Sequence, residues 1–360
     1  MKIIKAVTSA LVLSLTLNRY DSPSSASYYP DIDGTLLYHS YSSYTAMDSN
    51  VCCYDFRTGS LTEISSDSFV NAMNADFGSH PYDVTFMAID IACDEWDIYR
   101  YNALTNKIEN LTPNSGFRNE DPKFSPDGFK IVFKRGSWSH ELNDFVYNLA
   151  EIDLRTNEIT MLTDDVYEDS MPFYSCDGNK VCYARSYGGS SSIYELDLRT
   201  AIISPVYEES GVTAYYPMVS GDDLYFTKWY SAENHNDTIV KFADDEISLL
   251  PFNSADYNCS DPYPFGDSMF FSSTVNGSYD IFLFDGADTH ETNAVNTELH
   301  ELGSSFFSAQ ESEKVLTQTA GYILGKSTAE SNLDADGDGI VSSLDLTAFR
   351  HKLQPPSEEA

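Results

Sequence analysis

The stretch DPKFSPDGFKIVF, at residues 121–133, contains two short strand-like runs joined by a turn. Asp127 and Gly128 suit a tight turn, because Asp hydrogen-bonds its own backbone and Gly accepts a positive φ. The run KIVFKR, which starts at Lys130, is rich in the β-branched and aromatic residues that favour strands. This stretch therefore predicts an antiparallel pair of β-strands.

The same pattern recurs along most of the chain. Strand-like runs start at Thr35, Thr85, Lys130, Lys180, Asp223 and Ser268, with spacings of 50, 45, 50, 43 and 45 residues. Further short runs follow each of them, as in EIDLRTNEITMLT at residues 151–163. Four short strands in about 45 residues is the period of a propeller blade. A β-sandwich would need no repeat in register, so the sequence predicts an all-β propeller.

The runs at residues 121–133 and 151–163 resemble the TolB-type (WD40-like) β-propeller repeat. The repeats cover about residues 28–298, and the resemblance implies radial sheets around a channel. Six blades are expected, and a seventh remains an alternative, because Gly303–Phe306 and EKVLTQ at residues 313–318 continue the period. This segment either supplies a closing strand for the first blade or begins a truncated seventh one.

Charge and the N-terminal sequence restrict the partners and the location. The chain has 21 Lys and Arg against 56 Asp and Glu, a net charge of -35, so it should repel nucleic acid. Lys2 and Lys5 precede an apolar run at residues 6–17, which predicts a signal peptide over residues 1–26 and an exported protein. The run is shorter than the roughly 20 residues of a membrane span. The six cysteines show no metal-ligand spacing, and disulfides and buried thiols both remain open.

The sequence DADGDGIVSSLD at residues 334–345 has the spacing of a twelve-residue calcium loop. Calcium prefers six to eight oxygen ligands, which such a loop supplies from positions 1, 3, 5, 7, 9 and 12. Gly339 occupies position 6, where the loop bends sharply. The predicted ligands are Asp334, Asp336, Asp338, the carbonyl of Ile340, Ser342 through water, and Asp345. One calcium site is therefore expected.

This loop and the sequence after it, LDADGDGIVSSLDLTAFRHKL at residues 333–353, resemble one repeat of a dockerin. Dockerins attach exported proteins to cohesin modules of scaffoldins, as in cellulosomes. The resemblance implies a cohesin partner that contacts Ser343, Leu344, Arg350 and His351. A complete dockerin has two repeats, but residues 304–315 lack spaced carboxylates. The predicted organisation is a signal peptide (1–26), a propeller (27–310), a dockerin-like helical module with a degenerate first repeat (311–354) and a tail (355–360).

A candidate ligand face lies at the loops between the second and third strands of the predicted blades. Indole rings there can stack on sugar rings, or they can instead pack the rims of their own blades. Histidines predicted on the same face could ligate a metal, as in the TolB-like oligogalacturonate lyases. The tryptophans are Trp96, Trp138 and Trp229, and the histidines are His80, His140, His235 and His300.

Together these features predict an exported, scaffold-bound protein that presents a propeller to plant polysaccharide or to another protein. The alternative is a carbohydrate-active enzyme, a polysaccharide lyase or glycoside hydrolase, with its site at the propeller channel. The sequence contains no G-x-S-x-G motif and identifies no catalytic residue. A third reading is a structural protein in which the calcium loop only stabilises the C-terminus.

Overall fold

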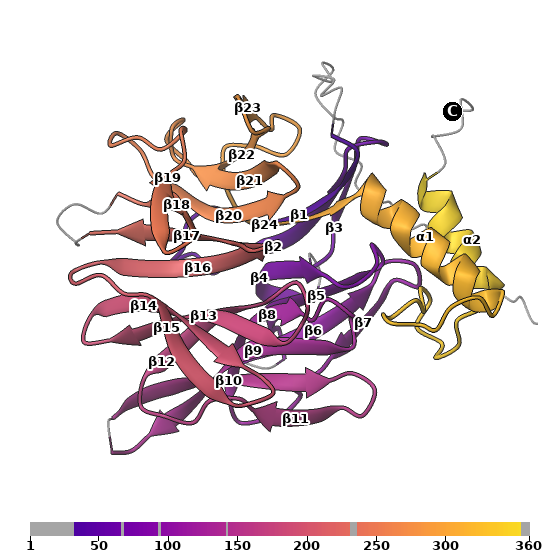
Figure 1. Ribbon diagram of the computed structural model, residues 1–360, viewed down its shortest axis with the longest axis horizontal. Coiled ribbons are helices and arrows are strands. Elements are labelled where there is room, and N and C mark those ends of the chain that lie inside the picture. Colours follow the sequence, from indigo (N-terminus) through magenta and orange to yellow (C-terminus); the bar gives the residue numbers. More distant parts are fainter. Residues whose placement is uncertain (1–31, 66–67, 93–94, 142, 231–235, 354–360) are drawn as a thin grey trace, which may run out of the picture.

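The computed structural model describes residues 32–65, 68–92, 95–141, 143–230 and 236–353 (Figure 1). The predicted signal peptide and the tail lie outside these residues. The described strands form antiparallel units of four strands each, and the innermost strands of all the units line one central cavity. Units four and five are joined into one eight-stranded sheet by a single parallel bridge between Ser191 and Thr213. This is the architecture that the repeat predicts.

The units and their strands follow, each from its innermost strand outwards. Units one to three are β24 (His300–Ser308), β1 (Gly34–Tyr41), β2 (Asn50–Asp55), β3 (Ser60–Glu63); β4 (Phe69–Phe77), β5 (Asp83–Asp90), β6 (Trp96–Asn102), β7 (Lys107–Asn110); β8 (Arg118–Phe124), β9 (Lys130–Ser139), β10 (Asp144–Asp153), β11 (Glu158–Met161). Units four to six are β12 (Glu168–Tyr174), β13 (Lys180–Tyr187), β14 (Ser190–Asp197), β15 (Ile202–Tyr207); β16 (Thr213–Ser220), β17 (Asp223–Trp229), β18 (Thr238–Ala243), β19 (Glu246–Leu249); β20 (Cys259–Phe265), β21 (Ser268–Ser273), β22 (Asp280–Phe284), β23 (Thr289–Glu291).

The first unit is completed by a strand from the far end of the repeat region. Strand β24 pairs antiparallel with β1, with Gly34 opposite Ser308 and Thr35 opposite Phe307. Residues 303–306 thus lie in a closing strand, and EKVLTQ at residues 313–318 lies in the helix that follows. The two ends of the repeat region are therefore held together by a ladder of backbone hydrogen bonds.

Each innermost strand has a register break at a residue with positive φ, and β4 has a second break between Phe69 and Asn71. A register break of this kind is a β-bulge, which bends the strand and twists it more strongly. The six residues are Asn74, Asp121, Met171, Tyr216, Asp261 and Gly303. In units three to six a proline follows, as at Pro122 and Pro172, and it withdraws one N–H from the ladder. The equivalent residue of unit two is Ala75. Pro81 lies 41 residues before Pro122 and so roughly continues the spacing of these prolines, but it stands in the β4–β5 connection and not in the innermost strand.

Two helices follow the last strand and lie side by side at the edge of the sheets (Figure 1). Helix α1 (Ala309–Ile323) starts directly after β24 with a capping box between Ser308 and Glu311. Helix α2 (Ser343–Leu353) follows the calcium-type loop. No helix within the described ranges is long and apolar enough to cross a membrane.

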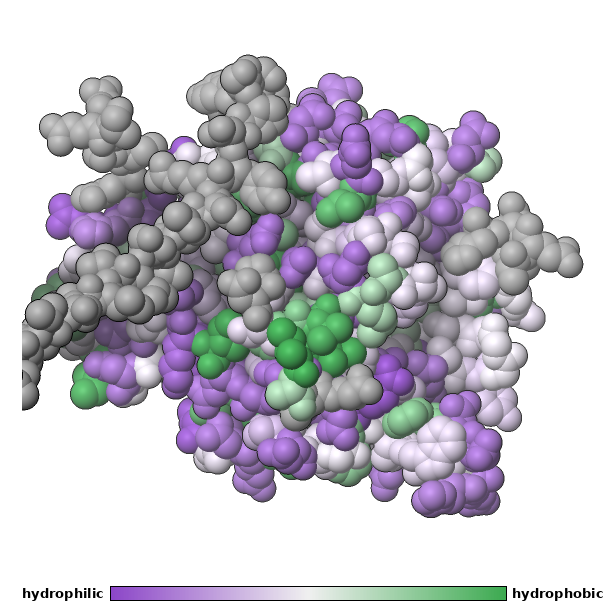
Figure 2. Space-filling model, turned by 180° about the vertical axis from the view of Figure 1, so that it is seen from behind, coloured by the Kyte–Doolittle hydropathy of each residue, from purple (hydrophilic) through white to green (hydrophobic). Residues whose placement is uncertain are grey.

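One face of the molecule is mixed in hydropathy. Seen from behind, hydrophilic side chains alternate with side chains of intermediate hydropathy, and a small group of hydrophobic ones lies near the middle of the view (Figure 2). Five of the six cysteines lie in the described ranges, and these five are unpaired: Cys52, Cys53, Cys176, Cys182 and Cys259. Cys93 lies outside the described residues.

Candidate calcium site and ligand face

Three carboxylates of the calcium-type loop converge on one point. Asp334, Asp336 and Asp338 each place a carboxylate oxygen so that all three atoms lie within 4.8 Å of one another. In the described part of the chain, no other group of three or more His, Cys, Asp or Glu side chains meets this criterion. The loop folds back at Gly337 and Gly339, whose φ values of 73° and 87° are costly for other residues.

Backbone N–H groups of the loop orient these carboxylates. Asp334 accepts hydrogen bonds from Gly337 at 2.8 Å and from Gly339 at 2.7 Å. Asp345 is fully buried and accepts from the N–H groups of Ala335 at 2.8 Å and Ser342 at 2.6 Å, so it ties the start of the loop to the start of α2. The loop is thus held in a compact form by its own carboxylates. This donor set, all oxygen, suits a hard cation such as calcium.

Electrostatic repulsion in the loop favours the arrival of a cation. Burial, together with the nearby carboxylates of Asp345, Asp338 and Asp334, raises the pKa of Asp336. A divalent cation among these oxygens would offset that repulsion. The Ile340 N–H donates to Asp338 at 2.8 Å, and the Ser342 hydroxyl accepts from the Leu344 N–H at 3.0 Å. The predicted ligands therefore belong to one hydrogen-bonded loop.

Helix α2 has a buried face and an exposed face. Asp345, Ala348 and Phe349 are buried. The four residues implied as cohesin contacts are all exposed: Ser343, Leu344, Arg350 and His351. Leu344 is 66% exposed. The exposed face of α2 is therefore free to contact a partner.

The structure explains why the expected first calcium repeat is absent. Residues 304–308 belong to strand β24, and Ala309 begins α1, so this part of the chain closes the propeller. Helix α1 then ends at Ile323, within the segment YILGKSTAES at residues 322–331.

The three tryptophans lie near the predicted loops but in different environments. Trp96 is 8% exposed and packs in the core between units two and three, with Phe133 among its neighbours in that cluster. Trp138 is 47% exposed at the end of β9, where its ring meets the Phe145 ring edge-on at 5.3 Å. Trp229 is half-buried at the end of β17. Trp138 is therefore the best placed of the three to contact a ligand.

None of the histidines within the described residues belongs to a group of three or more potential metal ligands. His80 lies in the turn between β4 and β5, at the opposite end of the strands from the β5–β6 loop, and it is fully buried. The prediction that His80 shares a face with the others is wrong, because His80 lies in the turn between the first and second strands of unit two and not in a loop between units. His140 is exposed beyond β9, and His300 stacks on Tyr41 at 5.3 Å. His235 lies outside the described residues.

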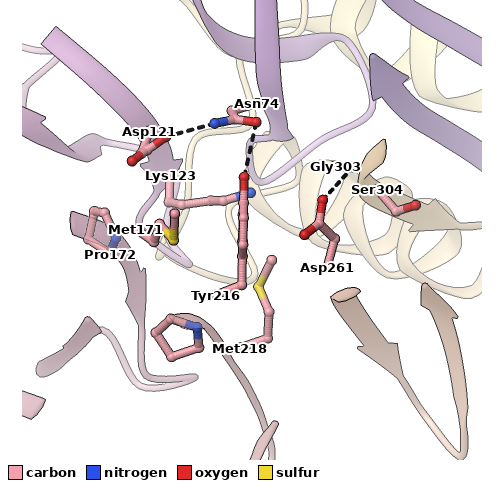
Figure 3. A pocket seen from close by; sticks show the side chains of 11 residues that line it. Asn74, Asp121, Lys123, Met171, Pro172, Tyr216, Met218, Asp261, Gly303 and Ser304 are labelled. Atoms are coloured by element: carbon pink, nitrogen blue, oxygen red, sulfur yellow. Dashed lines mark hydrogen bonds between the residues drawn. The ribbon is translucent and has the colours of Figure 1, made fainter. Parts of the chain in front are cut away.

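The sequence interpretation missed the polar groups on the propeller axis. The Tyr216 hydroxyl crosses the channel and donates to Asn74 Oδ1 at 3.3 Å, and Asn74 Nδ2 donates to Asp121 Oδ1 at 2.7 Å (Figure 3). Asp261 accepts from the Gly303 N–H at 3.2 Å, and burial raises the pKa of Asp261 to about 7. The signal that could have identified these groups was the residue before the proline in units three, five and six, which is Asp121, Tyr216 or Asp261.

The fold can now be compared with known structures. TolB from Acinetobacter baumannii has a TM-score of 0.57 at 15% identity, over 76% of this chain and 66% of that one. Kuenenia stuttgartiensis hydrazine synthase has a TM-score of 0.65 at 12% identity, over 78% of this chain and 47% of that one. A putative TolB from Agrobacterium tumefaciens has a TM-score of 0.53 at 14% identity, over 72% of this chain and 88% of that one. The fold is a TolB-type β-propeller. Identities this low show the propeller fold alone, and this chain spans about two thirds of the first structure and about half of the second.

No protein-family model matches the chain, and no curated protein does so.

Proposed function

We propose that this chain is an exported, six-bladed propeller protein that binds one calcium ion through residues 334–345 and docks through α2 onto a cohesin module of a scaffoldin. The observation that carries the proposal is the convergence of Asp334, Asp336 and Asp338 within 4.8 Å, shortly before a helix with an exposed face. Calcium would be held by these carboxylates, with Asp345 and the oxygens of Ile340 and Ser342 completing the oxygen set.

The exposed face of α2 has the composition of a small protein-binding surface. Ser343 and Leu344 stand at the start of the helix, next to the loop, and Arg350 and His351 stand two turns later. Leu344 supplies an apolar anchor, and Arg350 supplies a charged, multidentate donor. Calcium would act by fixing the loop and thereby the direction of the first turn of α2. Docking is therefore expected to require calcium.

A titration of a scaffoldin cohesin with the full chain tests this proposal. Binding measured by calorimetry should be present in calcium and lost in chelator. Leu344→Ala should weaken it about 10-fold or more, because apolar anchors at interface centres carry much of the affinity. Leu249→Ala, at an equally exposed leucine on β19 of unit five, is the matched control. Equal signals in calcium and in chelator would refute calcium-dependent docking.

The propeller is proposed to present a polysaccharide-binding surface near Trp138. The Trp138 ring contacts the Phe145 ring edge-on, and the Phe145 ring stacks on the Tyr147 ring at 5.8 Å. The Lys134 ammonium lies 4.0 Å from the centre of the Tyr147 ring. Aromatic rings with nearby polar groups are suited to sugar rings and their hydroxyls. Retention on insoluble plant polysaccharide measures this activity.

A further inference from the structure

The loop that carries the candidate calcium site is packed directly against the propeller. Leu333 and Ala335, at 2% and 0% exposed, belong to the same buried cluster as Val84 and Tyr101 of unit two. Ala348 and Phe349 of α2 belong to that cluster too. The loop and α2 are therefore part of the hydrophobic core of the propeller and do not hang from a linker.

Hydrogen bonds from the turns of unit two fix the loop in place. Ser79 Oγ donates to the Asn332 carbonyl at 2.7 Å, immediately before the loop. Asn102 Nδ2 donates to the carbonyl of Ala335, the second loop residue, at 2.8 Å. The backbone on both sides of Asp334 is thus held by side chains of the propeller.

Helix α2 is held from the same side. The Tyr82 hydroxyl donates to the Ala348 carbonyl at 2.8 Å, and the Tyr82 ring stacks on Phe349 at 5.9 Å. Lys352 forms an ion pair with Asp55 of unit one at 2.7 Å, and both side chains are largely buried. The contacts with α2 therefore extend over units one and two.

Comparison of the repeats shows that unit two differs at the residue that touches the loop. The turn between the third and fourth strands starts with Asp55 in unit one, Asp153 in unit three and Asp197 in unit four, and each accepts a hydrogen bond from a backbone N–H two residues later. In unit two the same position is Asn102, whose Oδ1 accepts from Leu104 and whose Nδ2 is free to donate to Ala335. An aspartate here could form the turn but could not donate to the loop.

We infer that unit two of the propeller takes the place of the missing calcium repeat: Asn102 and Tyr82 are positioning residues that hold the calcium loop and its helix in their binding conformation. The inference rests on the proposed calcium site. Because the loop shares a core with unit two, calcium binding also stabilises the propeller, as any ligand that binds only the folded state does.

The variant Asn102→Ser, Tyr82→Phe tests this directly in the full chain. Serine keeps an oxygen acceptor for the turn but cannot reach the loop, and phenylalanine keeps the ring on Phe349 without the hydroxyl. Each change removes one neutral hydrogen bond, so calcium affinity measured by calorimetry should fall about 3- to 10-fold per change. Tyr194→Phe is the control, since it removes a tyrosine hydrogen bond to Glu208 in unit four.

A second measurement does not depend on calcium. Hydrogen exchange of the α2 amides in chelator should be faster in the double variant than in wild type and in the control, because the helix is released from the propeller. If the wild type binds no calcium, the proposed calcium site is wrong, and the exchange experiment still decides the positioning role. If the wild type binds calcium and the double variant matches it in affinity and in exchange, the inference is wrong while the proposed function stands.

Discussion

Phe349 and Leu344 lie on one helix, but truncating them should change the free energy of unfolding by very different amounts. Phe349 is 1% exposed, with its ring 5.5 Å from the His80 ring and 5.9 Å from the Tyr82 ring. Replacing a fully buried phenylalanine by alanine costs about 3–5 kcal/mol, since apolar contact is lost and a cavity is left. We therefore expect Phe349→Ala to lower the free energy of unfolding by about 3–5 kcal/mol. Leu344→Ala should change it by less than about 0.5 kcal/mol, because Leu344 is 66% exposed.

Guanidinium denaturation followed by circular dichroism at the strand signal measures both variants. The assay reports on the propeller, so a loss in Phe349→Ala would show that the helix contributes to propeller stability. The experiment is run in chelator, where calcium affinity cannot contribute to the difference. A loss below about 1 kcal/mol in Phe349→Ala, or separate transitions for helices and strands in the wild type, would refute the shared core.

Three further predictions concern the propeller itself. Burial raises the pKa of Asp261 from 3.8 to about 7, so the stability that this protonated group contributes is present near pH 4 and is lost as the pH rises to 7. Asp261→Asn cannot ionise, so the free energy of unfolding of this variant should fall by up to about 4 kcal/mol less than that of the wild type between these pH values, as measured by denaturation across the range. Gly303→Ala should destabilise the chain more than Gly116→Ala, because both residues have φ near 70° but only the Gly303 Cβ would meet a neighbour, the His39 ring at 2.6 Å; equal unfolding temperatures would contradict this. Trp138→Ala should abolish retention on insoluble polysaccharide without changing the unfolding temperature, and unchanged retention would remove Trp138 from the ligand face.

The repeat could be predicted from the sequence because each unit encodes its own turns. Asp127 and Gly128 form a tight turn in unit three, where Gly128 has φ of 71° and its N–H bonds the Ser125 carbonyl at 2.8 Å. Local signals of this kind need no knowledge of the rest of the chain. The same locality produced the error in unit two, where Pro81 fits the period but Ala75 occupies the bulge position. His80 lies in the same β4–β5 connection and was likewise predicted on the wrong face.

The convergence of Asp334, Asp336 and Asp338 could also be predicted locally, since the three residues lie within the segment 334–338. The packing of the calcium loop against the propeller could not be predicted, because Asn102 and Ala335 are separated by 233 residues and neither shows a pattern that points to the other. The burial of Trp96 is a similar case, since it depends on Phe133 in the neighbouring unit. Contacts between units follow from the closed ring and become visible only once the ring is built.

The pairing of β24 with β1 sets the order in which the molecule can assemble. A chain made from its N-terminus presents β1 early, but its inner partner appears only when residue 308 has been synthesised. Until then the first unit has an unpaired inner edge, and an unpaired edge is open to other strands. Helix α1 begins directly after β24, and α2 later contacts units one and two through Asp55 and Tyr82. The C-terminal part of the chain from residue 300 onward therefore closes the propeller. A truncation before residue 300 would leave an open, aggregation-prone chain.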